Sequence, residues 1–195
     1  MPDFSGFVLA GGRSSRMGSD KAFLEFNGRT LLARAVELLK GLTPEVRIVG
    51  PAIKFAACGP VVEDIYGGRG PLAGIHAALA SSATELNLML AVDLPFVTES
   101  LLQFIVDCGR ASDALVTVPR IAGGYQPLCA VYRRAFAPLA EAELASGHNK
   151  IDALFSSTKT RVLEESELGR FAFCARMFEN LNTPEDFRRA AAEKP

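Results

Sequence analysis

The sequence predicts a single α/β domain with a mainly parallel central sheet. Strand-like apolar runs alternate with amphipathic helical segments along the whole chain, which is typical of a parallel sheet covered by helices. One run, residues 86–93, is apolar almost throughout, as expected of a strand buried on both faces. The 195 residues are 49% hydrophobic and 22% charged, enough for one core, and no repeat or linker divides them.

The first half of the chain carries the clearest strand and helix signals. Apolar runs predict strands at 6–10, 46–50, 61–64 and 86–93. Asn27-Gly28 predicts a tight turn. Helical spacing predicts helices at 31–40, 75–80 and 99–106. Thr30 and Thr98 are the expected N-caps of the first and third helices, and Pro71 suits the first turn of the second.

The second half continues the alternation with shorter elements. Strands are predicted at 113–118 and 125–132, and helices at 134–145 and 149–155. Because proline cannot donate a hydrogen bond to a sheet, Pro127 places the 125–132 strand near a sheet edge. A final turn-strand unit, residues 177–186, contains Thr183-Pro184, which are suited to the N-cap and first position of a last helix.

Charge and composition exclude several classes of protein. The formal net charge is −1, and no run of Lys and Arg occurs, which argues against a nucleic-acid partner. The first residues lack the basic start and apolar core of a signal peptide, and no apolar stretch approaches the roughly 20 residues of a membrane span. We therefore expect a cytoplasmic protein with no membrane partner.

The cysteines and histidines do not form a metal-ligand pattern. Because no C-x-x-C occurs, reduced core thiols rather than disulfides or zinc ligands are expected at Cys58, Cys108, Cys129 and Cys174. His76 and His148 have no second histidine or thiol at ligand spacing, so each is expected to be a surface or partly packed residue.

Residues 11–21 have the composition of a phosphate-binding loop. Glycines let the backbone turn and present N–H groups to anionic oxygens, while Arg16 and Lys21 supply positive charge. The Walker pattern fails because serine follows Gly18, and the Gly11-Gly12 pair breaks the dinucleotide pattern G-x-G-x-x-G. For a glycine-rich loop alone, the alternative is a solvated basic turn.

Asp93 stands at the carboxyl end of the strand predicted at 86–93. In open α/β sheets, ligands bind in the crevice beyond the carboxyl ends of the strands. Pro95 blocks helix continuation, and Thr98 rather than Asp93 suits the cap of the following helix. We therefore assign Asp93 to Mg²⁺, with Mn²⁺ as an alternative ion.

The run Leu-Ala-Gly-Gly-x-Ser-x-Arg-Met-Gly-x-Asp-Lys at 9–21 resembles a nucleotidyltransferase signature, most closely that of the molybdenum cofactor guanylyltransferases. In that family the Gly-Gly form of the loop accompanies GTP, and an Ala-Gly form accompanies CTP in a sister family. Gly-Pro-Leu-Ala-Gly at 70–74 and Asp-x-Pro at 93–95 resemble two further family elements. This length of match disfavours the basic turn. The chain departs from the family at 50–51, where Gly-Pro replaces an Asn that touches the nucleotide.

The resemblance implies a Rossmann-like three-layer α/β/α nucleotidyltransferase fold for residues 1–195. Residues 1–110 would mainly bind the nucleotide and residues 111–195 the acceptor. Asp64 matches an acidic residue that helps bind the nucleotide; alone, it would be a solvated strand-end carboxylate. The implied nucleotide-binding set is Leu9, Ala10, Gly11, Gly12, Lys21, Asp64, Gly70, Pro71, Leu72, Gly74 and Asp93.

Catalysis would be carried by Arg16, Lys21 and Asp93, and main-chain N–H groups of Gly11, Gly12 and their neighbours would donate to the phosphates. In the resembled family two later segments face the acceptor, which makes Gln126, Asn180 and Asn182 the candidates for that side.

The reaction implied by the resemblance is Mg²⁺-dependent transfer of GMP from GTP to the terminal phosphate of molybdopterin bearing molybdenum. Its products are molybdopterin guanine dinucleotide and pyrophosphate, and candidate protein partners are molybdenum-insertion proteins and molybdoenzyme chaperones. One alternative is cytidylyl or other nucleotidyl transfer to molybdopterin or to a sugar or alcohol phosphate. An alternative of another class is a GTP-binding module without turnover.

Overall fold

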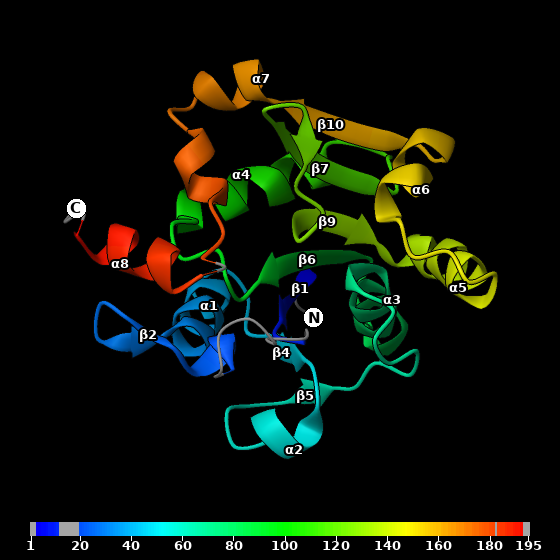
Figure 1. The fold of residues 1–195 in the computed structure, drawn as a ribbon. Helices are drawn as coiled ribbons and strands as arrows, with labels where there is room; N and C mark the ends of the chain where they lie inside the picture. Colours follow the sequence, from blue (N-terminus) through cyan, green and yellow to red (C-terminus); the bar gives the residue numbers. More distant parts are fainter. Residues whose placement is uncertain (1–2, 12–19, 182, 193–195) are drawn as a thin grey trace.

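A mixed sheet forms the middle layer of the molecule, with helices on both faces (Figure 1). The computed structural model describes residues 3–11, 20–181 and 183–192. Along the described sheet the strand order is β10-β7-β9-β6-β1-β4-β5, and β8 pairs with β7. The strands are β1 Phe4–Leu9, β4 Val46–Val49, β5 Val61–Val62, β6 Leu86–Ala91, β7 Val116–Ile121, β8 Gly124–Tyr125, β9 Cys129–Arg133 and β10 Thr160–Glu164.

The pairing is mainly parallel around the central strand β1. β1 lies parallel to both β6 and β4, β5 continues parallel beyond β4, and β10 is parallel to β7. β9 is antiparallel to both of its neighbours, β6 and β7. The predicted single α/β domain with a mainly parallel sheet is therefore confirmed.

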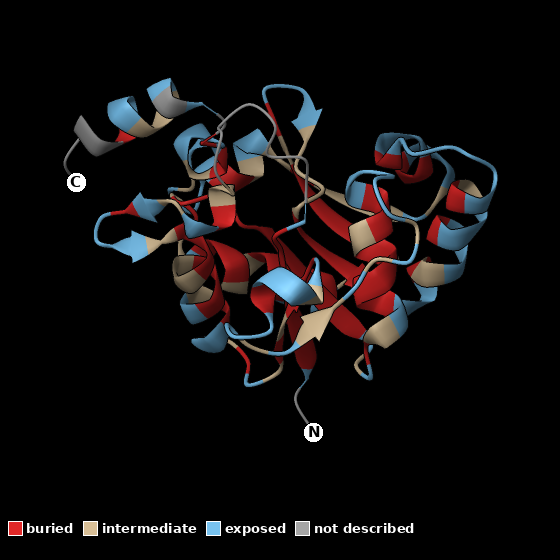
Figure 2. Ribbon diagram, turned by 60° about the horizontal axis from the view of Figure 1, so that its bottom comes forward, coloured by how far each residue is buried: buried red, intermediate tan, exposed pale blue. Residues whose placement is uncertain are grey.

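Two buried clusters, one on each face of the sheet, make up the core (Figure 2). Successive side chains of β1 alternate between them, since Phe4 and Val8 belong to one cluster and Phe7 and Leu9 to the other. The helices packed into the first cluster are α1 Leu31–Lys40, α2 Ala52–Phe55, α4 Glu99–Arg110, α7 Glu165–Gly169 and α8 Pro184–Ala192. Those packed into the second are α3 Pro71–Ser81, α5 Ala137–Ala145 and α6 Ile151–Ser157. This is the three-layer α/β/α arrangement.

Short polar signals set the helix starts, as predicted. The Thr30 hydroxyl accepts from the N–H of Ala33 at 3.1 Å and so caps α1. The Thr98 hydroxyl caps α4 in the same way, through the N–H of Leu101 at 3.3 Å. The Asn27-Gly28 turn is also confirmed, because it joins a two-stranded hairpin of β2 Glu25–Phe26 and β3 Arg29–Thr30.

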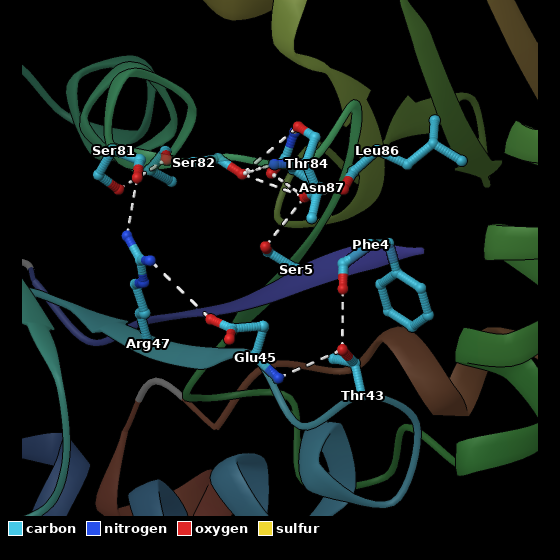
Figure 3. Close-up of polar contacts among 11 residues, drawn as sticks. Phe4, Ser5, Thr43, Glu45, Arg47, Ser81, Ser82, Thr84, Leu86 and Asn87 are labelled. Carbon is cyan, nitrogen blue, oxygen red and sulfur yellow. Dashed lines mark hydrogen bonds and ion pairs between the residues drawn. The ribbon is translucent and has the colours of Figure 1, made fainter. Parts of the chain in front are cut away.

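The amino-terminal ends of β1, β4 and β6 are tied together by side-chain hydrogen bonds (Figure 3). Thr43, just before β4, donates its hydroxyl to the carbonyl of Phe4 at 2.8 Å. Thr84, just before β6, donates to the Ser5 hydroxyl at 2.9 Å. These hydrogen bonds fix the amino-terminal edge of this part of the sheet.

The predicted edge position of the 125–132 strand is wrong. Pro127 lies in the turn that precedes β9, so it removes no hydrogen bond from the strand itself. β9 then runs through the interior of the sheet between β6 and β7. The predicted strand also splits in two, because residues 124–125 pair with β7 as β8.

Several other elements differ from the prediction. The strand predicted at 113–118 begins at Val116 in β7, and the sequence reading missed α2, β10 and α7. In the 177–186 unit, a 3₁₀ turn, Ala175–Phe178, stands where a strand was expected, and the described residues 179–181 form no strand. Two further 3₁₀ turns are η1 Lys21–Phe23 and η2 Arg134–Phe136.

The cysteines are free thiols, but they are not all in the core. Cys129 is buried, and burial raises its pKa to about 12, so the thiol stays protonated. Cys58 and Cys174 are exposed and Cys108 is half-buried, so the core placement is wrong for the two exposed residues. His148 is exposed as expected, whereas His76 is buried against Tyr66 at 5.4 Å between ring centroids. None of the described helices is long and apolar enough to cross a membrane.

Candidate active site

A cleft of about 820 Å³ opens at the carboxyl ends of β1, β4, β5 and β6. The crevice beyond the tips of parallel strands is the ordinary ligand site of an open α/β sheet. The predicted residues that line it are Leu9, Ala10, Gly11, Lys21, Asp64, Gly70, Pro71, Gly74 and Asp93. Gly12, Arg16 and Asn182, which were also predicted, lie outside the described residues.

Lys21 and Asp93 form an ion pair in the cleft. They are 72 residues apart in sequence, and the Lys21 Nζ lies 3.5 Å from the Asp93 Oδ2. Their side chains are 19% and 21% exposed, so the pair is partly screened from solvent yet open to a ligand. The parallel pairing of β1 with β6 brings them together, because the segments that carry them leave the same edge of the sheet.

The turn that carries Asp93 is held from three sides. Arg34 on α1 donates its Nε–H to the carbonyl of Pro95 at 2.8 Å. The Arg176 guanidinium lies over the Phe96 ring, 5.0 Å from its centroid. The N–H of Leu181 donates to the Asp93 carbonyl at 3.0 Å. These contacts hold the main chain of the turn, and none of them involves the Asp93 carboxylate.

The main-chain donors expected at the start of the loop are partly committed elsewhere. The N–H groups of Ala10 and Gly11 both donate to the carbonyl of Val49, at 3.0 and 3.1 Å. These two amides therefore prolong the contact between β1 and β4 instead of facing a phosphate. Both residues line the cleft, and donation of main-chain hydrogen bonds to a phosphate by Gly11, Gly12 and their neighbours stays a prediction.

The start of α3 forms one wall of the cleft, through Gly70, Pro71 and Gly74. Its N-cap, Gly70, has φ 74° and ψ −161°, a region that is essentially restricted to glycine. Gly70 has no side chain that could cap the helix, so the N-cap residue gives the first N–H groups of α3 no side-chain acceptor. Gly74 allows close packing on β1, because a Cβ there would lie 3.0 Å from the Leu9 Cδ2.

Leu72 does not line the cleft, although it belongs to the predicted set. Its side chain is fully buried in the cluster beneath α3. Any contact of Leu72 with a ligand would have to come from its main chain.

Asp64 has a structural role besides lining the cleft. Its Oδ1 accepts from the N–H of Tyr66 at 2.7 Å, which shapes the start of the glycine-rich segment leading to α3. From the sequence, the alternatives for Asp64 are a solvated strand-end carboxylate and a ligand contact. The half-buried carboxylate combines a turn-forming contact with a place on the cleft wall.

The two described acceptor candidates, Gln126 and Asn180, do not line the cleft but are close in sequence to residues that line it or contact its lining. Asn180 is exposed and directly precedes Leu181, whose N–H is bonded to the Asp93 carbonyl. Gln126 lies in the turn before β9, and its side-chain amide reaches the Gly124 carbonyl at 3.5 Å. Leu128 in the same turn lines the cleft, and its carbonyl accepts from the N–H of Ala91 at 2.7 Å.

The sequence reading overlooked one wall of the cleft, formed by Gly50, Pro51 and Glu63. In the sequence, Gly50-Pro51 indicates only a departure from the family pattern. A Cβ on Gly50 would lie 2.7 Å from the Phe55 ring, so the backbone there must be glycine for α2 to pack. Glu63 accepts from the N–H of Ala52 at 2.8 Å, which ties the start of α2 to the end of β5.

Known proteins share this arrangement. The family model described as MobA-like NTP transferase domain matches residues 6–162. The chain belongs to this family. It is 35% identical over 188 residues to a probable molybdenum cofactor guanylyltransferase of Pelotomaculum thermopropionicum, covering 95% of this chain and 91% of that protein. It is 32% identical over 193 residues to the molybdenum cofactor guanylyltransferase of Syntrophotalea carbinolica, covering 98% and 92%.

A solved structure agrees with the family assignment. The crystal structure of the molybdopterin-guanine dinucleotide biosynthesis protein A of Archaeoglobus fulgidus superposes with a TM-score of 0.85 at 26% identity. The comparison covers 96% of this chain and 97% of that one. The predicted nucleotidyltransferase fold is thereby confirmed. The family model ends within β10, so Asn180 lies beyond it, in a region that the full-length relatives cover.

The MobA-like site suits a nucleotide that carries a divalent cation. The described lining contains three carboxylates, those of Glu63, Asp64 and Asp93, and the ammonium of Lys21. No group of three His, Cys, Asp or Glu side chains converges as a complete metal site within residues 3–11, 20–181 and 183–192. Mg²⁺ usually binds through one or two carboxylates plus substrate phosphates and water, so a single placed carboxylate fits it.

Replacing Gly70 with Ala should lower the free energy of unfolding by about 1–3 kcal/mol, because alanine is strained at this φ and ψ. Gly67→Ala is the matched control in the same segment, since a Cβ there meets nothing within 4 Å and its φ is not in the left-handed region. Urea unfolding followed by circular dichroism measures both variants. Equal stability of the two would contradict the strained start of α3.

Proposed function

We infer that this chain transfers GMP from GTP to the terminal phosphate of molybdopterin, giving molybdopterin guanine dinucleotide and pyrophosphate. The relatives named molybdenum cofactor guanylyltransferase span nearly the whole chain. The observation that carries the inference is the Lys21–Asp93 pair, which places a cation and a metal-suited carboxylate 3.5 Å apart in the strand-tip cleft. A module that only bound nucleotide would need no such metal-suited carboxylate.

The reaction requires the protein to align the acceptor phosphate with the α-phosphorus of GTP and to neutralise the negative charge of the phosphate groups. A phosphate oxygen of the acceptor attacks the α-phosphorus of GTP, the bond from that phosphorus to the bridging oxygen breaks, and pyrophosphate leaves. Because a phosphate monoester has a second pKa of about 6, the attacking oxygen is already ionised at neutral pH. No general base is needed, and none is assigned.

We propose that Lys21 neutralises the charge that moves from the α-phosphate onto the leaving pyrophosphate. Its ammonium enters the cleft on one side, and its partly buried position strengthens its interaction with a phosphate. We assign Arg16 the same kind of role from the sequence pattern.

Asp93 would hold the Mg²⁺ ion, with Mn²⁺ as the alternative. When bound, the ion would withdraw charge from the phosphate oxygens of GTP. The Asp93 carboxylate would be a ligand of this ion, on a turn that Arg34, Arg176 and Leu181 hold in place.

The nucleotide is proposed to lie mainly against the first half of the chain and the acceptor against the second, divided near residue 110. Almost all described residues of the cleft lining come from residues 9–93, and Leu128 alone comes from the later half. On the nucleotide side we place Leu9, Ala10, Gly11, Gly12, Asp64, Gly70, Pro71, Leu72 and Gly74. On the acceptor side we place Gln126, Asn180 and Asn182.

The proposed function also suggests the protein's cellular location and its protein partners. We propose a cytoplasmic enzyme that receives molybdopterin from molybdenum-insertion proteins and passes its product to molybdoenzyme chaperones.

Pyrophosphate release with each of the four nucleoside triphosphates, Mg²⁺ and molybdopterin tests the proposed reaction. We expect release with GTP to be at least about tenfold faster than with the others, because a site that hydrogen-bonds one base leaves its polar groups unpaired with another. Release should also require molybdopterin. Faster turnover of CTP would identify a cytidylyl transferase, and tight GTP binding without release would identify a binding module.

Asn180→Ala tests the assignment of the acceptor side. Loss of one hydrogen bond, worth about 1 kcal/mol, should raise the KM for molybdopterin by about fivefold and leave the KM for GTP unchanged. Asn149→Ala is the matched control, since Asn149 is also an exposed asparagine but lies before α6. Initial rates of pyrophosphate release give both KM values. A selective rise in the KM for GTP would move Asn180 to the nucleotide side.

A further inference from the structure

The one-turn helix α2 contacts the segment that carries Lys21 at two points. Lys21 begins the 3₁₀ turn η1, which Asp20 precedes and Phe23 ends. Residues of α2 contact both Asp20 and Phe23, so the two contacts lie on either side of Lys21. Neither contact was foreseen from the sequence, because α2 itself was not predicted.

The first contact is polar. The Lys54 Nζ of α2 donates to the Asp20 Oδ2 at 2.8 Å. The other oxygen of the same carboxylate, Oδ1, accepts from the N–H of Ala22 at 3.2 Å and caps η1. The Lys54 ammonium therefore holds the carboxylate that organises the turn bearing Lys21.

The second contact is apolar. The ring of Phe55, which is fully buried, stacks against Phe23 with 5.7 Å between centroids and 30° between planes. The same Phe55 ring packs on Gly50, where a Cβ would lie 2.7 Å away. At its other end α2 is tied to Glu63 through the N–H of Ala52. The helix is thus held against the ends of β4 and β5 on one side and contacts η1 on the other.

We propose that Lys54 is a positioning residue, which holds Lys21 opposite Asp93 through Asp20. The 3.5 Å separation of Lys21 and Asp93 is at the outer limit of a direct hydrogen bond, so a small shift of η1 would separate them. Lys54 is itself about half exposed and is not among the described residues that line the cleft. Its effect is therefore indirect, and it rests on the role proposed for Lys21.

Two other roles for Lys54 predict different results. A surface ion pair without a functional role would change neither the rate nor substrate binding. A direct phosphate ligand would act without Asp20, and its removal would mainly raise the KM for GTP. A positioning residue needs Asp20, and its loss should lower kcat because the reacting groups are misaligned.

The test measures kcat and the KM for GTP by pyrophosphate release, together with thermal unfolding, for Lys54→Met, Lys54→Arg, Asp20→Asn and the double variant Lys54→Met/Asp20→Asn. Lys54→Met keeps the aliphatic stem, and Asp20→Asn keeps an oxygen that can cap Ala22. Lys40→Met is the matched control, since Lys40 is exposed at the end of α1.

We expect Lys54→Met to lower kcat by about tenfold with less than a twofold change in the KM for GTP, since misplacement of a catalytic group acts mainly on turnover. Lys54→Arg should recover most of the rate, the double variant should be no slower than Asp20→Asn, and Lys40→Met should match wild type. The thermal unfolding temperature should change little in any variant. If Lys54→Met fails to fold, kcat and the KM for GTP of Lys54→Arg and Asp20→Asn test the proposal.

An unchanged kcat in Lys54→Met would overturn the proposal. The proposal would also be overturned if Lys54→Met raised the KM for GTP both in the wild-type protein and in the Asp20→Asn variant. A Lys21→Met variant separates this proposal from the proposed function: full activity in Lys21→Met would remove the role assigned to Lys21 itself. Loss of activity in Lys21→Met with normal activity in Lys54→Met would refute only the positioning role of Lys54.

Discussion

The parallel pairing of β1 with β4 on one side and β6 on the other is the constraint on which the rest of the structure depends. Parallel strands end at the same edge of a sheet, so the polar segments that follow all three meet in one cleft. Lys21 follows β1, Pro51 follows β4 and Asp93 follows β6. The opposite ends of these strands are fixed by hydrogen bonds from Thr43 and Thr84. A shift in this register would separate the cation from the carboxylate.

Much of the fold could be predicted because its signals are local. Thr30 and Thr98 cap their helices within three residues, and the apolar run of β6 reports burial on both faces. The edge position predicted from Pro127 is wrong because strand order is not a local property: it depends on contacts between residues far apart in sequence. β10 was missed because its half-buried, mixed sequence has little apolar periodicity. α2 was missed because one turn of helix is too short to show a helical period.

The candidate site was predictable where a residue type alone carries the chemistry. Asp93 at a strand tip and Lys21 after a glycine-rich loop are such cases, and the structure brings them together. Main-chain contacts are harder to predict from the sequence. Ala10 and Gly11 show why, because the N–H groups of both donate to the carbonyl of Val49, which is distant in sequence. The wall at Gly50 could not be predicted, because the glycine is needed for packing against Phe55 and this packing does not correspond to a sequence motif.

A double-mutant cycle on Lys21 and Asp93 tests most directly whether the two residues act as one catalytic unit. The measurement is kcat for pyrophosphate release from GTP and molybdopterin, at saturating Mg²⁺, for wild type, Lys21→Met, Asp93→Asn and the double variant. Each single change should lower kcat by about 10²-fold or more, and the double variant should be little slower than the worse single one. Effects that multiply, or a single variant with wild-type kcat, would contradict the account.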